Sequence, residues 1–363
     1  MNNKIIDIIN NTNWIPGTSR NMPLFVTDII IKGYSQETDF MKGFRLRNLF
    51  YIYYNDFHKS FRDEKDMDLF AKKLSQLKLD KFLIYHQKEA EEESALFKEI
   101  NSNKEKILDF NKEKLVEFLE ICNKNVPKGL RVLQYPIFVS ILKEKGKLDI
   151  TDEKFIELNK LRDKHAKSAW SFVDEVVPLL IKKITEFVRI TEKQAGCMTA
   201  DEMIDSLRKG KLLISVEELN KRNELAVIVQ TSERRYIFTG DSAKEYKDLF
   251  NKKQSLSLDV LNGNPCYPGK LQGKICKIND QRELDKIRDG DILVTYMTTV
   301  HFTPCIDKIK AILTEEGGYT CHAVILAREF QKPCITGIKG IMDFIKDGDL
   351  VEVDANKGIV RKL

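Results

Sequence analysis

The chain has 363 residues, which is enough for two domains or three small ones, each with a hydrophobic core. Charged residues make up 32% and apolar residues 42% of the sequence, a balance typical of soluble globular proteins and unlike that of disordered chains. The formal charge of +5 is small and no dense basic stripe is present, so the sequence disfavours nucleic-acid binding.

The N-terminal stretch MNNKIIDIINN lacks the apolar core and the cleavage site of a secretory signal. The most apolar segment, residues 130–142, is interrupted by Arg131 and is too short to cross a bilayer. The seven cysteines are irregularly spaced and never form CxxC, which disfavours both a disulfide framework and a zinc ribbon. We therefore expect a cytoplasmic protein with no membrane association and no metal site.

Residues 35–190 have helical periodicity, with long Lys/Glu-rich segments and apolar residues at helical spacing. One apolar stripe runs from Phe155 to Val176 and includes His165, which we expect to be a core histidine with satisfied ring nitrogens. Pro178 should kink or end this helix. His58 and His86 stand among charged residues, and we expect both to be solvated.

Residues 199–202 and 215–218 have the sequence of capping boxes, in which a hydroxyl and a carboxylate satisfy the first amides of a helix. Residues 225–230 and 234–238 are rich in β-branched and aromatic residues around a polar turn, which predicts a hairpin. A helix over 242–250 follows. The sequence thus predicts a first domain, 1–254, that is mainly helical with a small hairpin near 225–240.

The composition changes near residue 255, where glycine and proline become frequent between short apolar segments. We predict an α/β domain over 255–363. Its expected strands and helices alternate along the chain: strands at 274–278, 292–295, 311–314, 334–336 and 350–353, and helices at 322–330 and 341–344. The fold class is therefore multidomain, a mostly helical N-terminal domain followed by a C-terminal α/β domain.

The segment GGYTCHAVILAR, residues 317–328, places a glycine turn between an apolar strand and a helix. Amides at a helix start favour a phosphate, and Gly317 and Gly318 permit backbone angles and a close approach that a Cβ would forbid. No Lys-Ser or Lys-Thr follows the glycines, so this is not a Walker loop. A neutral imidazole is a competent nucleophile near neutral pH, so His322 could carry a phosphoryl group.

The segment TEEGGYTCHAVILARE resembles the phosphohistidine signature of the PEP-utilising enzymes, among them pyruvate phosphate dikinase, phosphoenolpyruvate synthase and rifampicin phosphotransferase. The resemblance extends over the last hundred residues, through Pro268-Gly269, residues 290–294, residues 333–337 and Asp347-Gly348. It implies a swivelling mobile domain that carries phosphate between two sites. Residues 1–254 resemble, by pattern and order, the helical middle region of rifampicin phosphotransferase, which binds the acceptor.

The resemblance assigns roles to the residues of the signature. His322 would be the phosphoryl acceptor, while Gly317, Gly318, Thr320 and Cys321 would support the phosphate or the ring. Thr320 could equally be a helix cap, and Cys321 is more simply a small packing residue. Two further residues are possible participants: His301, in a loop that the family places near the phosphohistidine, and Arg328, for which a salt bridge is the simpler role. Three carboxylates could act as bases toward an acceptor hydroxyl, although nothing selects them over surface carboxylates: Asp56, Asp163 and Glu175.

These observations predict a phosphotransferase component in which His322 carries a phosphoryl group from a donor site to a small-molecule acceptor. Because the 363 residues carry no ATP-grasp or PEP-barrel motif, we expect the donor site on a separate ATP-grasp or PEP-binding protein. No cofactor would be bound by this chain alone, and ATP or phosphoenolpyruvate with Mg²⁺ would sit on the partner. The alternative is a non-catalytic ligand-binding or regulatory module descended from PEP-utilising enzymes. A self-sufficient kinase with a cryptic ATP site is a third, less favoured reading.

Overall fold

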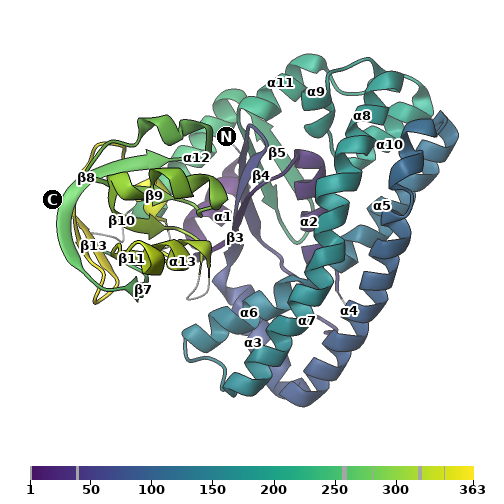
Figure 1. Ribbon diagram of the computed structural model, residues 1–363. Helices are drawn as coiled ribbons and strands as arrows, with labels where there is room; N and C mark the ends of the chain where they lie inside the picture. The colour runs from purple at the N-terminus through teal and green to yellow at the C-terminus, as the bar shows by residue number, and fades with distance from the viewer. Residues whose placement is uncertain (1, 38–40, 256–259, 280, 318–320, 339) are drawn as a thin grey trace. The chain divides into compact units, whose positions relative to one another are not determined.

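The computed structural model describes the chain except for residues 1, 38–40, 256–259, 280, 318–320 and 339 (Figure 1). The chain divides into two compact units, Met1–Lys247 and Asp248–Leu363. The first unit is mostly helical and the second is α/β, which confirms the predicted fold class. The structure divides the chain between Lys247 and Asp248, within α12 (Gly240–Ser255), whereas the predicted boundary between residues 254 and 255 falls seven residues later, in the last turn of the same helix.

The N-terminal unit contains a five-stranded antiparallel sheet in the order β1-β3-β2-β4-β5. The predicted hairpin is present as its last two strands. It is one edge of a sheet whose other strands come from the first 63 residues of the chain. The bounds are β1 (Trp14–Asn21), β2 (Leu49–Tyr54), β3 (Phe57–Asp63), β4 (Ala226–Gln230) and β5 (Arg235–Thr239).

The prediction of a helical segment starting at residue 35 is wrong for β2 and β3. The sequence of β2 is LFYIYY, a run of aromatic and β-branched side chains that favours a strand buried on both faces. Between the two strands, Asn55 and Asp56 both have positive φ, 48° and 58°, as a two-residue hairpin turn requires. Five of the six residues of β2 are buried, so burial in the sheet interior decides the conformation.

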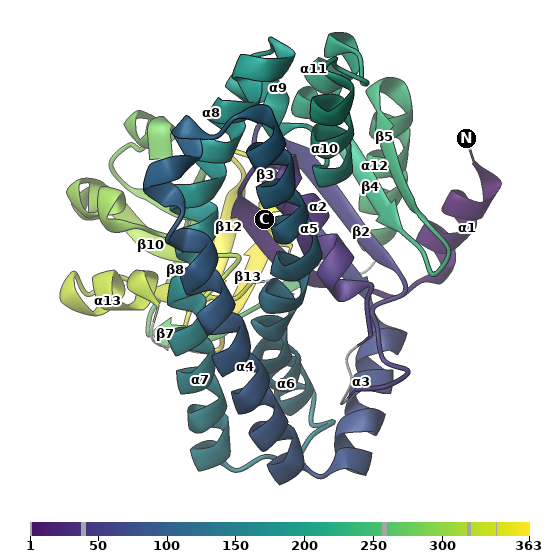
Figure 2. The ribbon, with the colours of Figure 1, turned by 90° about the vertical axis from the view of Figure 1, so that its right-hand side faces the viewer.

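Helices cover this sheet, and Figure 2 shows the long helices α4, α5 and α7 running side by side. None of the helices among the described residues is both long and apolar enough to cross a membrane. The helical elements of the unit are α1 (Asn3–Asn11), α2 (Leu24–Tyr34), α3 (Glu64–Leu77), α4 (Leu79–Asn101), the 3₁₀ segment η1 (Lys104–Asp109), α5 (Lys112–Val132), α6 (Gln134–Glu144), α7 (Asp152–Ser171), the π-helical segment η2 (Phe172–Val176), α8 (Val177–Val188), α9 (Glu192–Gly196), α10 (Ala200–Lys209) and α11 (Val216–Glu224).

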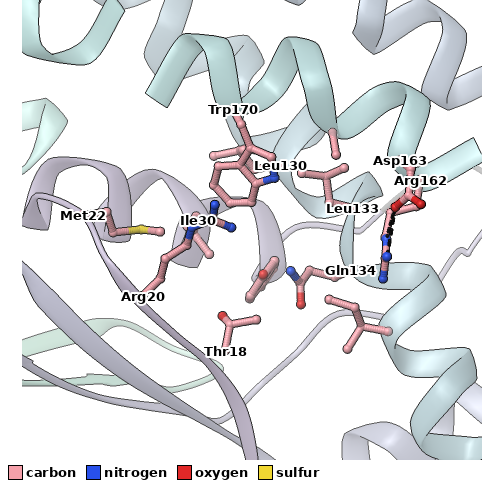
Figure 3. A pocket seen from close by; sticks show the side chains of 13 residues that line it. Thr18, Arg20, Met22, Ile30, Leu130, Leu133, Gln134, Arg162, Asp163 and Trp170 are labelled. Carbon is pink, nitrogen blue, oxygen red and sulfur yellow. Dashed lines mark hydrogen bonds and ion pairs between the residues drawn. The ribbon is translucent and has the colours of Figure 1, made fainter. Parts of the chain in front are cut away.

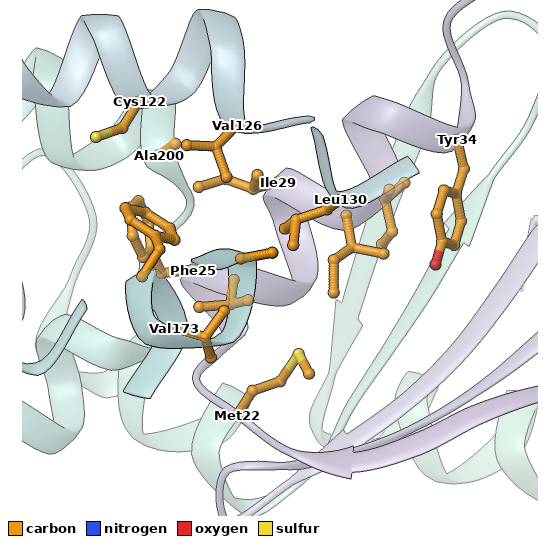
Figure 4. Packing of buried hydrophobic residues seen from close by; sticks show 14 of the residues in the cluster. Met22, Phe25, Ile29, Tyr34, Cys122, Val126, Leu130, Val173 and Ala200 are labelled. Atoms are coloured by element: carbon orange, nitrogen blue, oxygen red, sulfur yellow. The ribbon is translucent and has the colours of Figure 1, made fainter. Parts of the chain in front are cut away.

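The core of the unit forms around α2, which is buried along almost its whole length. A helix that is apolar on every side belongs inside a protein. Figure 4 shows Phe25 and Ile29 of α2 packed among side chains of α5, including Val126 and Leu130. The two helices approach closely at Gly33, where an added Cβ would lie 2.0 Å from the carbonyl oxygen of Pro127.

The predicted apolar stripe is confirmed: Leu158, His165 and Ala169 are buried on α7. The helix does not end at Pro178, which occupies the first turn of α8. Instead, the regular α-helix gives way to the π-helical segment η2 just before the proline. A proline cannot donate its amide and crowds the preceding turn, so a local widening of the helix lets the chain continue in the same direction.

The C-terminal unit is built on an eight-stranded sheet in the order β6-β13-β12-β8-β9-β10-β11-β7. The four neighbouring strands β8, β9, β10 and β11 are parallel, and the remaining pairs are antiparallel. The bounds are β6 (Val260–Asn262), β7 (Asn264–Tyr267), β8 (Lys270–Ile278), β9 (Asp291–Thr295), β10 (Ile309–Thr314), β11 (Cys334–Thr336), β12 (Leu350–Asp354) and β13 (Ile359–Lys362).

Two α-helices and two 3₁₀ segments connect these strands: η3 (Gln281–Lys286), η4 (Val300–Lys308), α13 (His322–Glu329) and α14 (Ile341–Phe344). The apolar face of α13, with Ala323, Leu326 and Ala327, packs into a core with strand residues such as Leu293 and Ile312. Every strand and helix predicted for this unit is present. Strands β6, β7 and β13 and the 3₁₀ segments are additional to the prediction.

Candidate phosphohistidine site

His322 is the first residue of α13, at the carboxyl edge of the parallel strands. Cys321 is the N-cap residue and makes no side-chain capping hydrogen bond. The imidazole therefore lies where the partial positive charge of a helix N-terminus favours an anion. His322 is half-buried, so one side of the residue contacts the protein and the other faces solvent.

Thr298 supports the imidazole ring. Its Oγ1 lies 3.1 Å from Nδ1 of His322, and its side chain is 7% exposed. The two residues meet because β9 and β10 are parallel neighbours, with Thr295 opposite Thr314, so the segments that follow both strands leave the sheet at the same edge. When the threonine oxygen accepts the Nδ1 proton, Nε2 keeps its lone pair and can act as a nucleophile.

The turn before His322 is anchored at its start. The amides of Glu315 and Glu316 donate to the carbonyl oxygens of Thr295 and Tyr296, at 3.0 and 2.8 Å. The buried carboxylate of Glu315 also accepts a hydrogen bond of 2.9 Å from the amide of Met342, at the start of α14. These bonds fix where the chain leaves β10.

Gly317 has a φ of +121°, in the region that glycine adopts and side chains disfavour. A Cβ at this position would lie 2.8 Å from Sγ of Cys321 and 3.6 Å from Cβ of Thr336. Cys321 therefore packs against Gly317, and Gly317 also lies close to the end of β11. This contact fits the prediction of a small packing residue.

A second cysteine, Cys266, contacts Thr336. Sγ of Cys266 is 3.2 Å from Oγ1 of Thr336 and 3.3 Å from the carbonyl oxygen of Asn264. A hydrogen bond from the Cys334 thiol lowers the pKa of Cys266 to about 6, with a further contribution from Thr336. The thiol form of this half-buried sulfur donates to the Asn264 carbonyl, and the lowered pKa of Cys266 makes its thiolate easier to form than that of an ordinary cysteine.

Two large apolar side chains that are near Thr298 or His322 in the sequence are half exposed. Met297, which precedes Thr298, and Ile325, one helical turn after His322, are each 50% exposed. Large apolar side chains are usually buried. An exposed apolar surface near His322 suits contact with another molecule, which group transfer by this residue would require.

The structure brings together three of the predicted site residues: Gly317, Cys321 and His322. Gly318 and Thr320 lie outside the described residues. His301, in η4, and Arg328, on α13, are both exposed, and no described contact joins either to His322. Arg328 forms no ion pair with the described carboxylates. Its charge contributes instead to the lowered pKa of Cys266.

Thr298 is the site residue that the sequence did not single out. A usable signal was present, because a hydroxyl residue follows one predicted parallel strand and the histidine follows another. The three carboxylates considered as bases have other partners. Asp56 accepts a hydrogen bond from Tyr53, Asp163 is paired with Arg162 and Glu175 is paired with Lys104.

The three remaining histidines of the chain are buried in the N-terminal unit. The prediction for His165 is confirmed: its Nδ1 lies 2.7 Å from Oγ of Ser94 and its Nε2 lies 3.0 Å from the carbonyl oxygen of Gly129. The prediction that His58 and His86 are solvated is wrong, since both are 0% exposed. Their charged sequence neighbours occupy other faces of the same strand or helix. Burial lowers the pKa of His58 to about 3 and that of His86 to about 4.

Groups of three or more His, Cys, Asp or Glu side chains that could hold a metal ion do not occur among the described residues. The described site consists of an imidazole at a helix N-terminus whose Nδ1 lies within hydrogen-bond distance of a threonine hydroxyl.

Residues 287–358 match the family model for the PEP-utilising enzyme mobile domain. A probable phosphoenolpyruvate synthase of Archaeoglobus fulgidus is 45% identical over 101 residues, which are 28% of this chain and 13% of that protein. The rifampicin phosphotransferase of Bacillus subtilis is 30% identical over 166 residues, 45% of this chain and 18% of that protein. Residues 287–358 are therefore similar to the PEP-utilising enzyme mobile domain, as the motifs of the C-terminal unit predict.

The chain spans less than a fifth of the length of either curated relative. Among solved structures, Enzyme I aligns with 76% of this chain and 79% of its own chain at 16% identity. The TM-score of that alignment is 0.21, too low to support any argument about the fold.

Proposed function

We propose that this chain is a phosphotransferase component in which His322 carries a phosphoryl group between a donor and an acceptor. The observation that carries this proposal is the hydrogen bond between Thr298 and Nδ1 of His322, in a domain that matches the PEP-utilising mobile domain. This hydrogen bond engages Nδ1 and leaves Nε2 to act as the nucleophile.

In the first step, Nε2 of His322 attacks the phosphorus of the donor, and the bond from phosphorus to the leaving oxygen breaks with its electron pair on that oxygen. The product is a phosphohistidine with a P–N bond. In the second step an oxygen of the acceptor attacks the phosphorus, and the P–N bond breaks to regenerate the imidazole. Helix-terminal amides stabilise the negative charge of the phosphoryl group while it is on the histidine.

The donor site is proposed to lie on a separate ATP-grasp or PEP-binding protein, where ATP or phosphoenolpyruvate would be held with Mg²⁺. The matched regions are 13% and 18% of proteins named for phosphoenolpyruvate synthesis and rifampicin phosphorylation, so most of each relative lies outside the match. The acceptor is proposed to be a small molecule. Transient docking of donor and carrier is compatible with phosphoryl transfer, which depends mainly on positioning and charge stabilisation.

A small-molecule donor tests the histidine without any partner protein. Incubation with potassium phosphoramidate should place a single acid-labile, base-stable phosphate on the chain, detected by intact mass and by ³¹P NMR. The phosphate should be lost in His322→Ala and retained in His301→Ala, the matched control because His301 is an exposed histidine of the same unit. Phosphate retained by His322→Ala would contradict the proposal.

A second experiment tests the carrier role. The unmodified chain is incubated with radiolabelled phosphoenolpyruvate and a PEP-binding enzyme of this family, and His322 should become labelled. In the reverse direction, the phosphorylated chain should transfer its phosphate from His322 to the enzyme. A chain that phosphoramidate labels but that exchanges label with neither an ATP-grasp nor a PEP-binding protein would favour the regulatory-module alternative.

A further inference from the structure

Two cysteines of the C-terminal unit lie on neighbouring strands, Cys266 on β7 and Cys334 on β11. The strands are antiparallel, and their register pairs Tyr267 with Cys334 and Pro265 with Ile335. Cys266 is therefore the extra residue of a bulge, opposite the step from Cys334 to Ile335. Opposed residues of antiparallel strands have Cα atoms about 4.5–5.5 Å apart, and a disulfide spans about 4.4–6.8 Å. The pairing is compatible with a bond between the two sulfur atoms.

The two side chains differ in their access to solvent. Both pack in the apolar core that includes Ala323 and Leu326 of α13, where the Cys334 thiol donates a hydrogen bond to Cys266. Cys334 is 0% exposed, whereas Cys266 is half-buried. A dissolved reagent can therefore reach the sulfur of Cys266, while the sulfur of Cys334 can react only with an atom that lies next to it.

The surroundings of the two thiols also move their pKa values in opposite directions. The hydrogen bond from Cys334 lowers the pKa of Cys266 to about 6, and the same hydrogen bond, together with burial, raises the pKa of Cys334. Oxidants react with thiolates and not with thiols, so the accessible member of the pair is also the more reactive one. The buried member remains a thiol until its neighbour has reacted.

The pair contacts the helix that begins at His322. Sγ of Cys334 lies 3.9 Å from the carbonyl oxygen of Ala323, in the first turn of α13. Sγ of Cys266 lies 3.2 Å from Oγ1 of Thr336, at the end of β11. A disulfide has no S–H group, so its formation would remove the donor that faces the Ala323 carbonyl, one residue from His322 in the sequence.

We propose that Cys266 and Cys334 form a redox modification site, at which a peroxide converts the two thiols into a disulfide. First, the sulfur of Cys266 attacks one oxygen of the peroxide: an S–O bond forms, the O–O bond breaks, and the leaving oxygen takes up a proton. The sulfur is oxidised to a sulfenic acid, and hydrogen peroxide is reduced to water. Then the sulfur of Cys334 attacks that of Cys266, the S–S bond forms, and the S–O bond breaks with release of a second water.

The modification is reversible by thiol–disulfide exchange. Two equivalents of a thiol reductant restore both cysteines and are themselves oxidised to a disulfide. The inference concerns the two cysteines alone and holds whether or not His322 transfers phosphate.

Treatment of the reduced full chain with hydrogen peroxide near neutral pH tests this site. The intact mass should decrease by two hydrogen atoms, and peptide mapping without reduction should recover one bridge, between Cys266 and Cys334. Dithiothreitol should restore the original mass. A bridge between any other two cysteines of the chain, or oxidation without a bridge, would overturn the proposal.

Variants separate the roles of the two sulfurs. Cys334→Ser keeps a hydrogen-bond donor but lacks the second sulfur, so a sulfenic acid should accumulate on Cys266 and be trapped by dimedone. Cys266→Ser should give neither the bridge nor the dimedone adduct. Cys305→Ser is the matched control, because Cys305 is a half-buried cysteine that packs against the same core, and it should form the bridge at the wild-type rate.

Dimedone labelling of Cys266→Ser that equals that of Cys334→Ser would also contradict the proposal, as would loss of the bridge in Cys305→Ser. Circular dichroism identifies any variant that fails to fold. The peptide map of the unsubstituted chain decides the question independently of the variants.

Discussion

Replacing His86 should change how the stability of the chain depends on pH. His86 is fully buried on α4, stacked on Phe82 with ring centres 5.8 Å apart and edge-on to Tyr135 at 5.9 Å. Neither ring nitrogen has a hydrogen-bond partner among the described residues. Burial, together with the nearby His165, lowers the pKa of His86 to about 4.

The direction of the pH effect on stability follows because the pKa of His86 is lower in the folded chain than in the unfolded chain. The unfolded chain has a histidine pKa of about 6.5, so between pH 6.5 and 4 the unfolded state binds a proton that the folded state rejects. The stability that the neutral ring permits is complete above pH 6.5 and is lost as the pH falls toward 4. Linkage with these two values gives a loss of about 1.4 kcal/mol at pH 5.5 and less than about 0.1 kcal/mol at pH 7.5.

Urea unfolding of the wild-type chain and of His86→Leu at pH 7.5 and 5.5 measures this difference. The leucine variant should be at least as stable as the wild type at pH 7.5, because it removes two buried polar nitrogens without partners. The difference in free energy of unfolding between the variant and the wild type should be about 1.3 kcal/mol larger at pH 5.5 than at pH 7.5. An advantage of His86→Leu that is the same at both pH values would refute the reasoning.

Three further predictions concern other parts of the chain. Thr298→Val should slow phosphorylation of His322 by phosphoramidate about 3- to 10-fold, the equivalent of one hydrogen bond, with little loss of stability; an unchanged rate would contradict the orienting role. Gly33→Ala should destabilise the N-terminal unit by at least about 1–3 kcal/mol in urea unfolding, because the new methyl group would collide with the Pro127 carbonyl. Alkylation of Cys266 by iodoacetamide should reach half its maximal rate near pH 6; half-maximal rate at the ordinary thiol value near 8.5 would show that its neighbours do not stabilise the thiolate.

The C-terminal unit was predictable because each of its elements has a local signal. Gly317 has the positive φ that a glycine turn implies, and the helix begins at His322 as the apolar pattern after it indicates. The antiparallel strands at the edges of the sheet lacked such signals. They are three to four residues long, and β6 and β7 pair with strands far along the chain.

The N-terminal unit was predicted less completely because tertiary contacts decide its local structure. The run Leu49–Tyr54 carries no alternation between polar and apolar residues, so its strand conformation could be inferred only from composition. Lys59, Arg62 and His58 make β3 look like a polar segment, yet all three are buried. Arg20 lies over the ring of Trp170, 150 positions further along the chain (Figure 3), and no sequence pattern predicts this contact.

A histidine that carries a phosphoryl group must satisfy two opposing requirements, a fixed ring and access to a second molecule. The buried histidines of the N-terminal unit have the first without the second: His165 has partners on both nitrogens, and His58 is 0% exposed. His301 is exposed, but no described hydrogen bond orients its ring. Among the five histidines of the chain, all of them described, His322 combines a half-exposed position with a hydrogen bond to one ring nitrogen. Nucleophilic transfer needs this combination, because orientation lowers the entropic part of the barrier and exposure admits the donor.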